Sequence, residues 1–234
     1  ALEALESSSP KSLAEAVLAR CEEALPRPDL AARVYLLPGD GESRLLVGPM
    51  KGVMGLSLGS QAMLLFLWPV AAWEEWLAYT VAHEYTHLVR NHLFPRGMVG
   101  GRMVYLKTQE PDTLLDALVS EGVADVFAQD LYPHLQPPWT DALSSGEEAL
   151  AWPKVRRRLS VSDPAEIRRF LFGDGDRVPM WTGYTIGFKV VRGYLERHPR
   201  SRPGSLISLP AQVVLEGSGY GGGNPRPPTS SPSH

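Results

Sequence analysis

Two histidines and a glutamate lie in a short run whose spacing suits a metal ion. The run is Val81-Ala82-His83-Glu84-Tyr85-Thr86-His87-Leu88-Val89-Arg90, which contains His83-Glu84-x-x-His87. Residues four apart on a helix lie on one face, so both imidazoles can reach one ion. Glu84 leans toward the edge of that face, where it can touch a metal-held water without binding the metal. The spacing predicts hydrolytic chemistry at a zinc ion.

A catalytic zinc ion takes three protein ligands and a water. Glu121 is the best candidate for the third ligand, because it falls on a separate, later helix and Asp125 follows it four residues on. Two carboxylates on a mostly apolar helix are costly unless they are paired. A His-x-x-Gly-x-x-His extension of the motif is absent, and His92, near the predicted helix end, is expected to bind no metal.

Turn residues and apolar periodicity predict the elements that position these groups. We expect a helix from Pro10 to Leu25 and strands at Arg33–Leu37, Leu45–Val47, Val53–Leu58 and Ala62–Trp68. A long helix then runs from about Ala71 to about His92, with its histidines on a buried stripe. A second helix, from Thr113 to about Leu131, carries Glu121 and has Asp112 as its expected N-cap. Further helices are expected from Ser145 toward Arg158, from Pro164 to Phe172, and from Thr182 to His198.

This order of elements predicts an α+β fold. A small N-terminal β-sheet packs on the helix of the His83-Glu84 motif, and a mostly helical part follows. We expect residues 1–216 to form one compact, two-lobed unit, with a sheet lobe at 30–70 and a helical lobe at 71–216. Residues 217–234 are rich in Gly, Pro and Ser and are expected to be a disordered tail.

Composition excludes several classes of function. The 234 residues carry a formal net charge of −3, which gives no general electrostatic case for nucleic acid. The bases between Lys154 and Arg202 are expected to be solvated helix faces rather than an anion or membrane-surface patch. Cys21 is the single cysteine, which excludes an intrachain disulfide and fits a cytoplasmic protein. Ala1–Leu5 lacks the features of a signal peptide.

One segment needs a separate argument, because Gly52–Trp73 has no charged residue and is long enough to span a bilayer. Its glycines and Pro69 favour strands and turns instead. A protease anchored to a membrane through this segment is therefore a minor alternative.

Three stretches resemble a bacterial family of predicted zinc-dependent proteases, the DUF2268 or YjaZ-like group. They are Tyr79–Arg90, Ser120-Glu121-Gly122-Val123-Ala124-Asp125 and Gly183-Tyr184-Thr185-Ile186-Gly187. The pair Glu121 and Asp125 also resembles the Glu-x-x-x-Asp of thermolysin-like, or gluzincin, metalloproteases. That resemblance implies a minimal thermolysin-like fold with one Zn²⁺ on His83, His87 and Glu121. It also implies that Asp125 orients His83 through the ring nitrogen that faces away from the metal.

The remaining parts of a peptidase site can be assigned by role. Glu84 is the expected general base for water attack on a peptide carbonyl. Tyr184 is the expected donor to the developing oxyanion, since it follows Gly183 at a helix start and Gly187 would allow close approach to the cleft; His198 and His134 are weaker candidates. By resemblance to thermolysin-like folds, an edge strand holding Ala62, Met63, Leu64 and Leu65 is expected to bind extended substrate by strand addition.

The predicted function is therefore a zinc-dependent peptidase acting on peptides or proteins, and an endopeptidase because no signature for a free N-terminus is found. The alternative is an inactive or weakly active zinc-binding module with a regulatory or chaperone-like role. An intact Glu84 argues against that alternative, because a binding module needs no general base.

Overall fold

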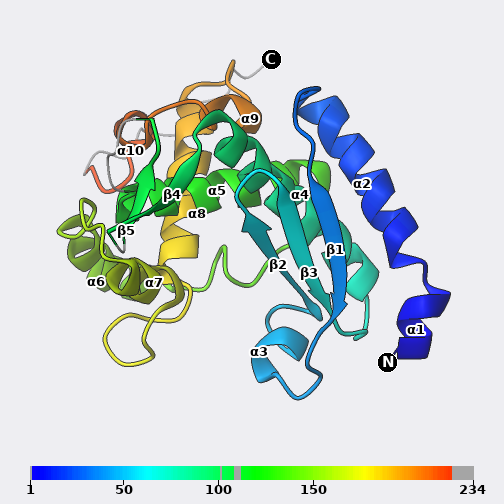
Figure 1. Cartoon of the computed structure of the whole chain (residues 1–234). Coiled ribbons are helices and arrows are strands. Elements are labelled where there is room, and N and C mark those ends of the chain that lie inside the picture. The colour runs from blue at the N-terminus through cyan, green and yellow to red at the C-terminus, as the bar shows by residue number, and fades with distance from the viewer. Residues whose placement is uncertain (1, 101, 108–111, 223–234) are drawn as a thin grey trace, which may run out of the picture.

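The computed structural model describes residues 2–100, 102–107 and 112–222 of the chain, which fold as a mixed α+β protein (Figure 1). The helices are α1 (Leu2–Ser7), α2 (Pro10–Ala24), α3 (Arg44–Val47), α4 (Trp73–Leu93), α5 (Leu114–Leu131), α6 (Ser145–Arg156), α7 (Pro164–Phe172), α8 (Thr182–Arg197), α9 (Pro203–Leu206) and α10 (Ala211–Ser218). The strands are β1 (Arg33–Pro38), β2 (Val53–Leu58), β3 (Ala62–Leu67), β4 (Arg96–Val99) and β5 (Arg102–Tyr105).

The larger sheet has the order β1-β3-β2, with β1 parallel and β2 antiparallel to β3. Alternate residues of β3 point inward, and Met63, Leu65 and Leu67 are buried. This inner face packs on α4. The sheet therefore fixes β2 directly beside the helix that carries His83 and Glu84.

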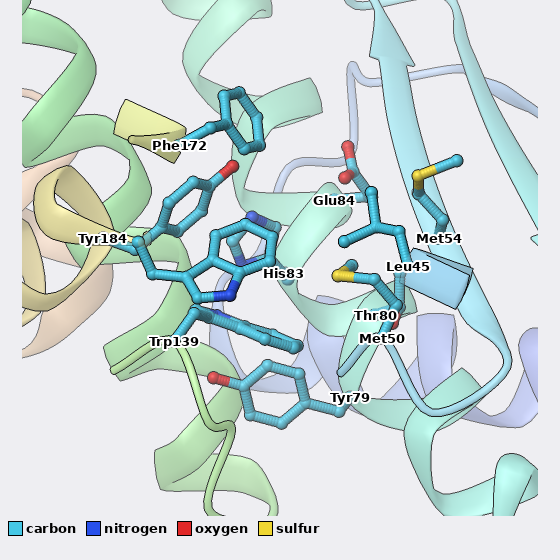
Figure 2. A pocket seen from close by; sticks show the side chains of 12 residues that line it. Leu45, Met50, Met54, Tyr79, Thr80, His83, Glu84, Trp139, Phe172 and Tyr184 are labelled. Carbon is cyan, nitrogen blue, oxygen red and sulfur yellow. The ribbon is translucent and has the colours of Figure 1, made fainter. Parts of the chain in front are cut away.

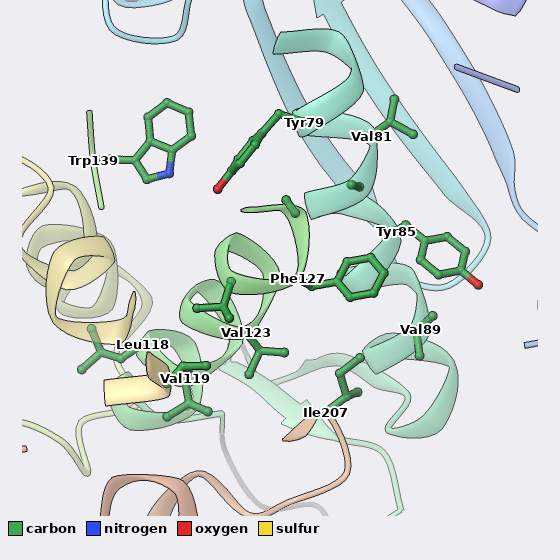
Figure 3. Packing of buried hydrophobic residues seen from close by; sticks show 14 of the residues in the cluster. Tyr79, Val81, Tyr85, Val89, Leu118, Val119, Val123, Phe127, Trp139 and Ile207 are labelled. Atoms are coloured by element: carbon green, nitrogen blue, oxygen red, sulfur yellow. The ribbon is translucent and has the colours of Figure 1, made fainter. Parts of the chain in front are cut away.

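Helix α4 lies at the centre of the fold, packed against α2, the sheet and α5. Nearly its whole length is buried, including polar residues such as Thr86 and Arg90. Tyr85 stacks on Phe127 of α5 with ring centroids 6.4 Å apart (Figure 3). Apolar packing on several sides thus holds the motif helix rigidly, as a preorganised metal site requires.

Helices α5 and α8 cross at two glycines. A Cβ on Gly187 would lie 2.1 Å from the Leu118 carbonyl oxygen, and a Cβ on Gly122 would lie 2.2 Å from the Gly187 carbonyl oxygen. Only hydrogen at both positions lets the backbones meet this closely. Gly187 therefore serves the packing of α8 on α5, rather than the approach of substrate that the sequence suggested.

Several local predictions were wrong. Leu45–Val47 forms helix α3 instead of a strand, because the Ser43 hydroxyl accepts a hydrogen bond from the Leu46 N–H and caps a helical turn. Asp112 is not the N-cap of α5. Thr113 and Asp116 form a capping box there, and Asp112 instead bonds Arg96 and Tyr105.

Other elements were missed. The β4–β5 hairpin and the short helix α9 were not predicted. Gly217 and Ser218, assigned to the tail, close α10, and the Tyr220 hydroxyl donates to Glu148 at 2.6 Å. The rest of the predicted tail, 223–234, lies outside the described residues.

The charge-free segment Gly52–Trp73 consists of β2, β3 and their connections up to the first residue of α4. Among the described residues, none of the helices has both the length and the apolar character needed to cross a membrane. The segment on which the anchored alternative rested forms strands rather than a helix up to Trp73.

Candidate metal centre

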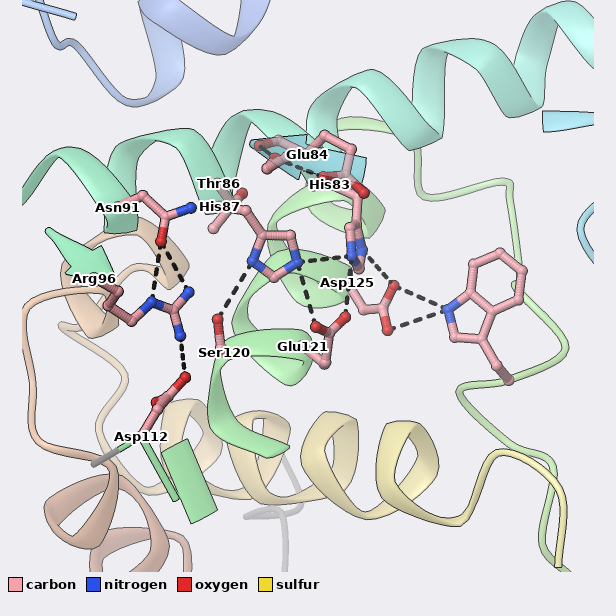
Figure 4. A network of polar contacts seen from close by, with 12 residues as sticks. His83, Glu84, Thr86, His87, Asn91, Arg96, Asp112, Ser120, Glu121 and Asp125 are labelled. Carbon is pink, nitrogen blue, oxygen red and sulfur yellow. Dashed lines mark hydrogen bonds and ion pairs between the residues drawn. The ribbon is translucent and has the colours of Figure 1, made fainter. Parts of the chain in front are cut away.

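Helices α4 and α5 bring three side chains that could hold a metal ion to one point (Figure 4). His83 Nε2 lies 3.1 Å from His87 Nε2 and 3.3 Å from a carboxylate oxygen of Glu121. The other Glu121 oxygen lies 3.5 Å from His87 Nε2. The sequence predicted these three residues as ligands, and the fold places their donor atoms together.

The spacing of these atoms suits zinc. Ligands about 2.1 Å from a tetrahedral ion lie roughly 3.4 Å from one another. The observed separations of 3.1, 3.3 and 3.5 Å, of which the last two end on different oxygens of Glu121, bracket that value. Two imidazoles and one carboxylate, with a fourth direction open to the cleft, form the ligand set of catalytic rather than structural zinc sites. The residues present therefore fit one zinc ion.

Asp125 is completely buried beneath His83, and its Oδ1 lies 2.9 Å from His83 Nδ1. A carboxylate at this place keeps the proton on Nδ1 and leaves the Nε2 lone pair for a metal. Asp125 itself accepts hydrogen bonds from the Tyr79 hydroxyl at 3.1 Å and from Trp139 Nε1 at 3.0 Å. Tyr79 and Trp139 thus hold the carboxylate that orients His83.

His87 has its own partner on α5. Its Nδ1 lies 3.3 Å from the Ser120 hydroxyl, whose oxygen can accept the ring proton. Ser120, Glu121 and Asp125 lie within two turns of the same helix and meet both rings (Figure 4). Helix α5 therefore supplies one candidate ligand, Glu121, and the groups that contact the two histidine rings.

The electrostatics of the cluster reflect this crowding. Burial lowers the pKa of His83, but the charge and hydrogen bond of Asp125, with those of Glu121, raise it well above its usual value. Burial raises the pKa of Glu121, while His87 and His83 together hold it below its usual range. The carboxylates therefore favour a cation at the rings, as a metal site requires.

Strand β2 positions Glu84, which the sequence analysis did not anticipate. The Ser57 hydroxyl donates to Glu84 Oε2 at 2.6 Å and to the Glu84 backbone carbonyl at 3.1 Å. Gly55 makes room for the same side chain, since a Cβ there would lie 2.5 Å from Glu84 Cγ. The glycine-laced β2 carried a signal for close approach, but only the sheet shows that Glu84 is the neighbour.

The cleft extends to both sides of His83 and Glu84. One cavity of about 130 Å³ runs toward the N-terminus of α4 and is walled by aromatic and methionine side chains such as Trp139, Phe172 and Met54 (Figure 2). A second, of about 340 Å³, runs toward His87, Asn91 and Arg96. Gly55, Phe172 and Tyr184 line both cavities, which are therefore two halves of one cleft.

Tyr184, the predicted oxyanion donor, lies in the cleft wall across from Glu84 (Figure 2). Its ring is packed against Phe172 and Trp181, with centroid distances of 5.4 and 5.3 Å. Burial and the negative charge of Glu121 raise the pKa of Tyr184 well above its usual value. The hydroxyl therefore keeps its proton and can donate a hydrogen bond.

The other histidines of the described residues, His92, His134 and His198, lie outside this cluster. His92 Nε2 pairs with Asp29 at 2.7 Å, and the exposed His134 lies 3.8 Å from Glu75. His198 stacks on Tyr194. None of these three lines the cleft, so His134 and His198 are not supported as alternatives to Tyr184.

The predicted substrate strand is wrong in one respect. Residues Ala62–Leu65 belong to β3, which is the central strand and pairs with β1 on one side and β2 on the other. Its backbone has no free edge for strand addition. Strand β2 is the edge strand at the cleft, because it pairs with β3 alone among the described strands and carries Gly55, Leu56 and Ser57 into the cavity wall.

Most of the chain matches one known protein family. A family model described as "Predicted Zn-dependent protease (DUF2268)" matches residues 11–216, which is most of the chain. The chain belongs to this family. It is also 29% identical over 140 residues to the uncharacterized protein YjaZ of Bacillus subtilis (strain 168), an alignment that covers 58% of this chain and 48% of that protein. The chain thus spans about half the length of this relative. No solved structure matches the chain.

Proposed function

We propose that this DUF2268 member is a zinc-dependent peptidase of thermolysin-like type, with one zinc ion on His83, His87 and Glu121. The observation that carries the proposal is the convergence of three side chains beside a cleft that Glu84 also lines: the two histidine Nε2 atoms lie 3.1 Å apart, and each lies 3.3–3.5 Å from one of the Glu121 oxygens. Zinc held there would polarise a water and the carbonyl of a bound peptide. The remaining work falls to side chains of the chain itself.

Glu84 acts as the general base. It accepts a proton from the attacking water and delivers it to the leaving nitrogen of the peptide. The Ser57 hydroxyl donates to Glu84 Oε2, and no hydrogen bond among the described residues involves Glu84 Oε1. One carboxylate oxygen is therefore held in place while the other is available to the water.

Tyr184 stabilises the peptide oxygen as negative charge develops on it. Its hydroxyl is protonated and held by ring packing on the opposite wall of the cleft from Glu84. A donor aimed at a developing oxyanion needs no reorganisation during the reaction. Asp125 meanwhile keeps His83 in the tautomer that presents Nε2.

The cleft favours an endopeptidase. It continues past the metal centre on both sides, so a peptide chain can extend in both directions from the bond to be cut. The free edge of β2 offers backbone N–H and C=O groups for pairing with an extended substrate. Substrate strand addition is therefore assigned to β2 in place of Ala62–Leu65.

The competing function is a zinc-bound module that binds proteins without cutting them. The contacts of Glu84 with Ser57 and Gly55 favour catalysis, because they hold a carboxylate at a position where a binding module needs none.

A quenched-fluorescence peptide library separates the two functions. Wild-type protein should contain about one zinc ion per chain and cleave a subset of peptides. Glu84→Gln should keep the zinc and lose turnover, whereas Glu74→Gln, an exposed change on the same helix, should behave as wild type. Cleavage by Glu84→Gln at the wild-type rate would remove Glu84 as the base. Wild-type protein that binds peptides with zinc loaded but cuts none would establish the binding module.

A further inference from the structure

A separate cavity, of about 420 Å³, lies away from the cleft of the metal centre, between the end of α4, the β4–β5 hairpin and the start of α10. Its volume is within the range of small-molecule sites. Its apolar wall is formed by Leu93, Phe94, Pro95, Ile207, Leu209 and Pro210. None of the groups proposed for catalysis lines it.

Arg90 forms part of this wall and is an unusual buried cation. Its side chain is only 7% exposed, yet its Nε has no hydrogen-bond partner among the described residues. The other guanidinium nitrogens reach the Ile207 carbonyl at 3.4 Å and the Tyr105 hydroxyl at 3.1 Å. A buried guanidinium with an unused donor is costly, and such groups call for a ligand, ion or water.

The nearest carboxylate does not satisfy Arg90. Asp116 lies 3.9 Å from Arg90 Nη2, beyond hydrogen-bond distance. Its Oδ2 already accepts from the Thr113 backbone N–H at 3.0 Å and from the Thr113 hydroxyl at 2.6 Å, as part of the α5 capping box. Asp116 therefore offsets part of the charge of Arg90 without a hydrogen bond to it, while its Oδ2 caps α5.

Two further features make the cavity attractive to an anion. Lys107 is exposed at its wall, so the described residues of the lining carry two cations against one carboxylate. The N-terminus of α10 also meets the cavity at Pro210 and Ala211, and no side chain caps it. A helix start presents free N–H groups and partial positive charge, both of which favour anions.

We propose that this cavity, which we call the Arg90 pocket, binds a small carboxylate that carries an apolar body. The carboxylate sits between Arg90, Lys107 and the start of α10, and the apolar body lies against Phe94, Leu209 and their neighbours. The site is separate from the proposed peptidase function and does not depend on it.

Octanoate is a suitable probe in isothermal titration calorimetry on the zinc-loaded protein. Octanoate should bind. Octanol lacks the charge and inorganic phosphate lacks the apolar body, so each should bind at least about tenfold more weakly than octanoate. Equal binding of octanol would remove the role of the cations. Equal binding of phosphate would remove the role of the apolar wall. No octanoate binding would mean that the cavity holds water alone.

Variants locate the binding, because octanoate could also reach the metal centre. Lys107→Glu should weaken octanoate binding about tenfold, whereas Lys11→Glu, the same exposed change on α2, should leave it within about twofold. Ser208→Trp, at the exposed mouth, should block the pocket. If the direct variant Arg90→Gln does not fold, Lys107→Glu and Ser208→Trp still test the proposal. Octanoate binding that is unchanged in both would place the ligand elsewhere and overturn the proposal.

Discussion

Asp125 Oδ1 and His83 Nδ1 lie 2.9 Å apart, and Asp125 has no solvent exposure. The indole N–H of Trp139 donates to both oxygens of the same carboxylate, at 3.0 and 3.2 Å. The orientation of a proposed zinc ligand therefore depends on a buried carboxylate and on a tryptophan from the loop after α5.

Asp125→Asn should weaken zinc binding about 10- to 100-fold, because an amide cannot accept from His83 and Trp139 together without placing its own N–H groups against one of them. Trp139→Phe should weaken it by about tenfold or less. Competition with a chromophoric chelator measures both. Asp130→Asn, an exposed change on α5, should have no effect. Wild-type affinity in Asp125→Asn would show that His83 needs no such partner.

Ser57→Ala should lower kcat about tenfold at unchanged zinc content, because Glu84 loses the 2.6 Å bond that holds its carboxylate. KM should change little, since Ser57 is proposed to act through Glu84. Steady-state kinetics on a library-derived peptide would measure kcat and KM separately. Ser60→Ala, in the turn after β2, provides the matched control. A full wild-type kcat in Ser57→Ala would show that the bond has no catalytic role.

Tyr184→Phe should lower kcat about 100-fold, as is typical for loss of one oxyanion donor. The ring packing against Phe172 and Trp181 is preserved, so thermal stability and zinc content should remain close to wild type. Tyr194→Phe, on the same helix but beside His198, should leave kcat unaltered. Should Tyr184→Phe retain wild-type turnover, the oxyanion donor lies elsewhere.

Gly187→Ala should destabilise the fold by about 1–3 kcal/mol, because the new Cβ would meet the Leu118 carbonyl at 2.1 Å and push α8 away from α5. Urea unfolding measures the change. Gly146→Ala is the control, since a Cβ there meets nothing within 4 Å and alanine favours the helical state. Equal stabilities of the two variants would contradict the close crossing of the helices.

Asp174 holds the loop between α7 and α8. Its Oδ1 accepts from the backbone N–H groups of Arg177 and Val178, and its Oδ2 accepts from Arg169 at 2.7 Å. The backbone bond from Val178 and the Arg169 pairing hold the pKa of Asp174 well below its usual range. A depressed folded-state pKa adds stability above the unfolded pKa of about 4, and this stability is lost as the pH falls through the folded value.

Asp174→Asn should therefore lower Tm at pH 7, and its difference from wild type should narrow below about pH 4. Thermal denaturation over a pH series measures this difference. Asp176→Asn, an exposed neighbour, should not lower Tm. A difference that is the same at pH 3 and pH 7 would show that the charge of Asp174 is not the cause.

Much of the site could be predicted from local sequence. Helical periodicity places His83 and His87 on one face of α4, and Glu121 and Asp125 on one face of α5, because one turn separates the members of each pair. Both helices form over nearly the predicted ranges. The short apolar runs also predicted β2 and β3, because runs of these residue types bounded by turn residues are typical of strands.

Other features depend on which segments meet in space. The sequence could not place β3 at the centre of the sheet or β2 beside Glu84, because strand order is decided by long-range pairing. Ser57, Trp139 and the unsatisfied Arg90 gain meaning only from partners far along the chain. Spacing along α4 therefore determined that His83 and His87 could share a metal ion, and spacing along α5 determined that Glu121 and Asp125 face the same way. Only the packing of α4 against α5 and β2 decided how those residues are held, because hydrogen bonds between distant segments leave no local pattern.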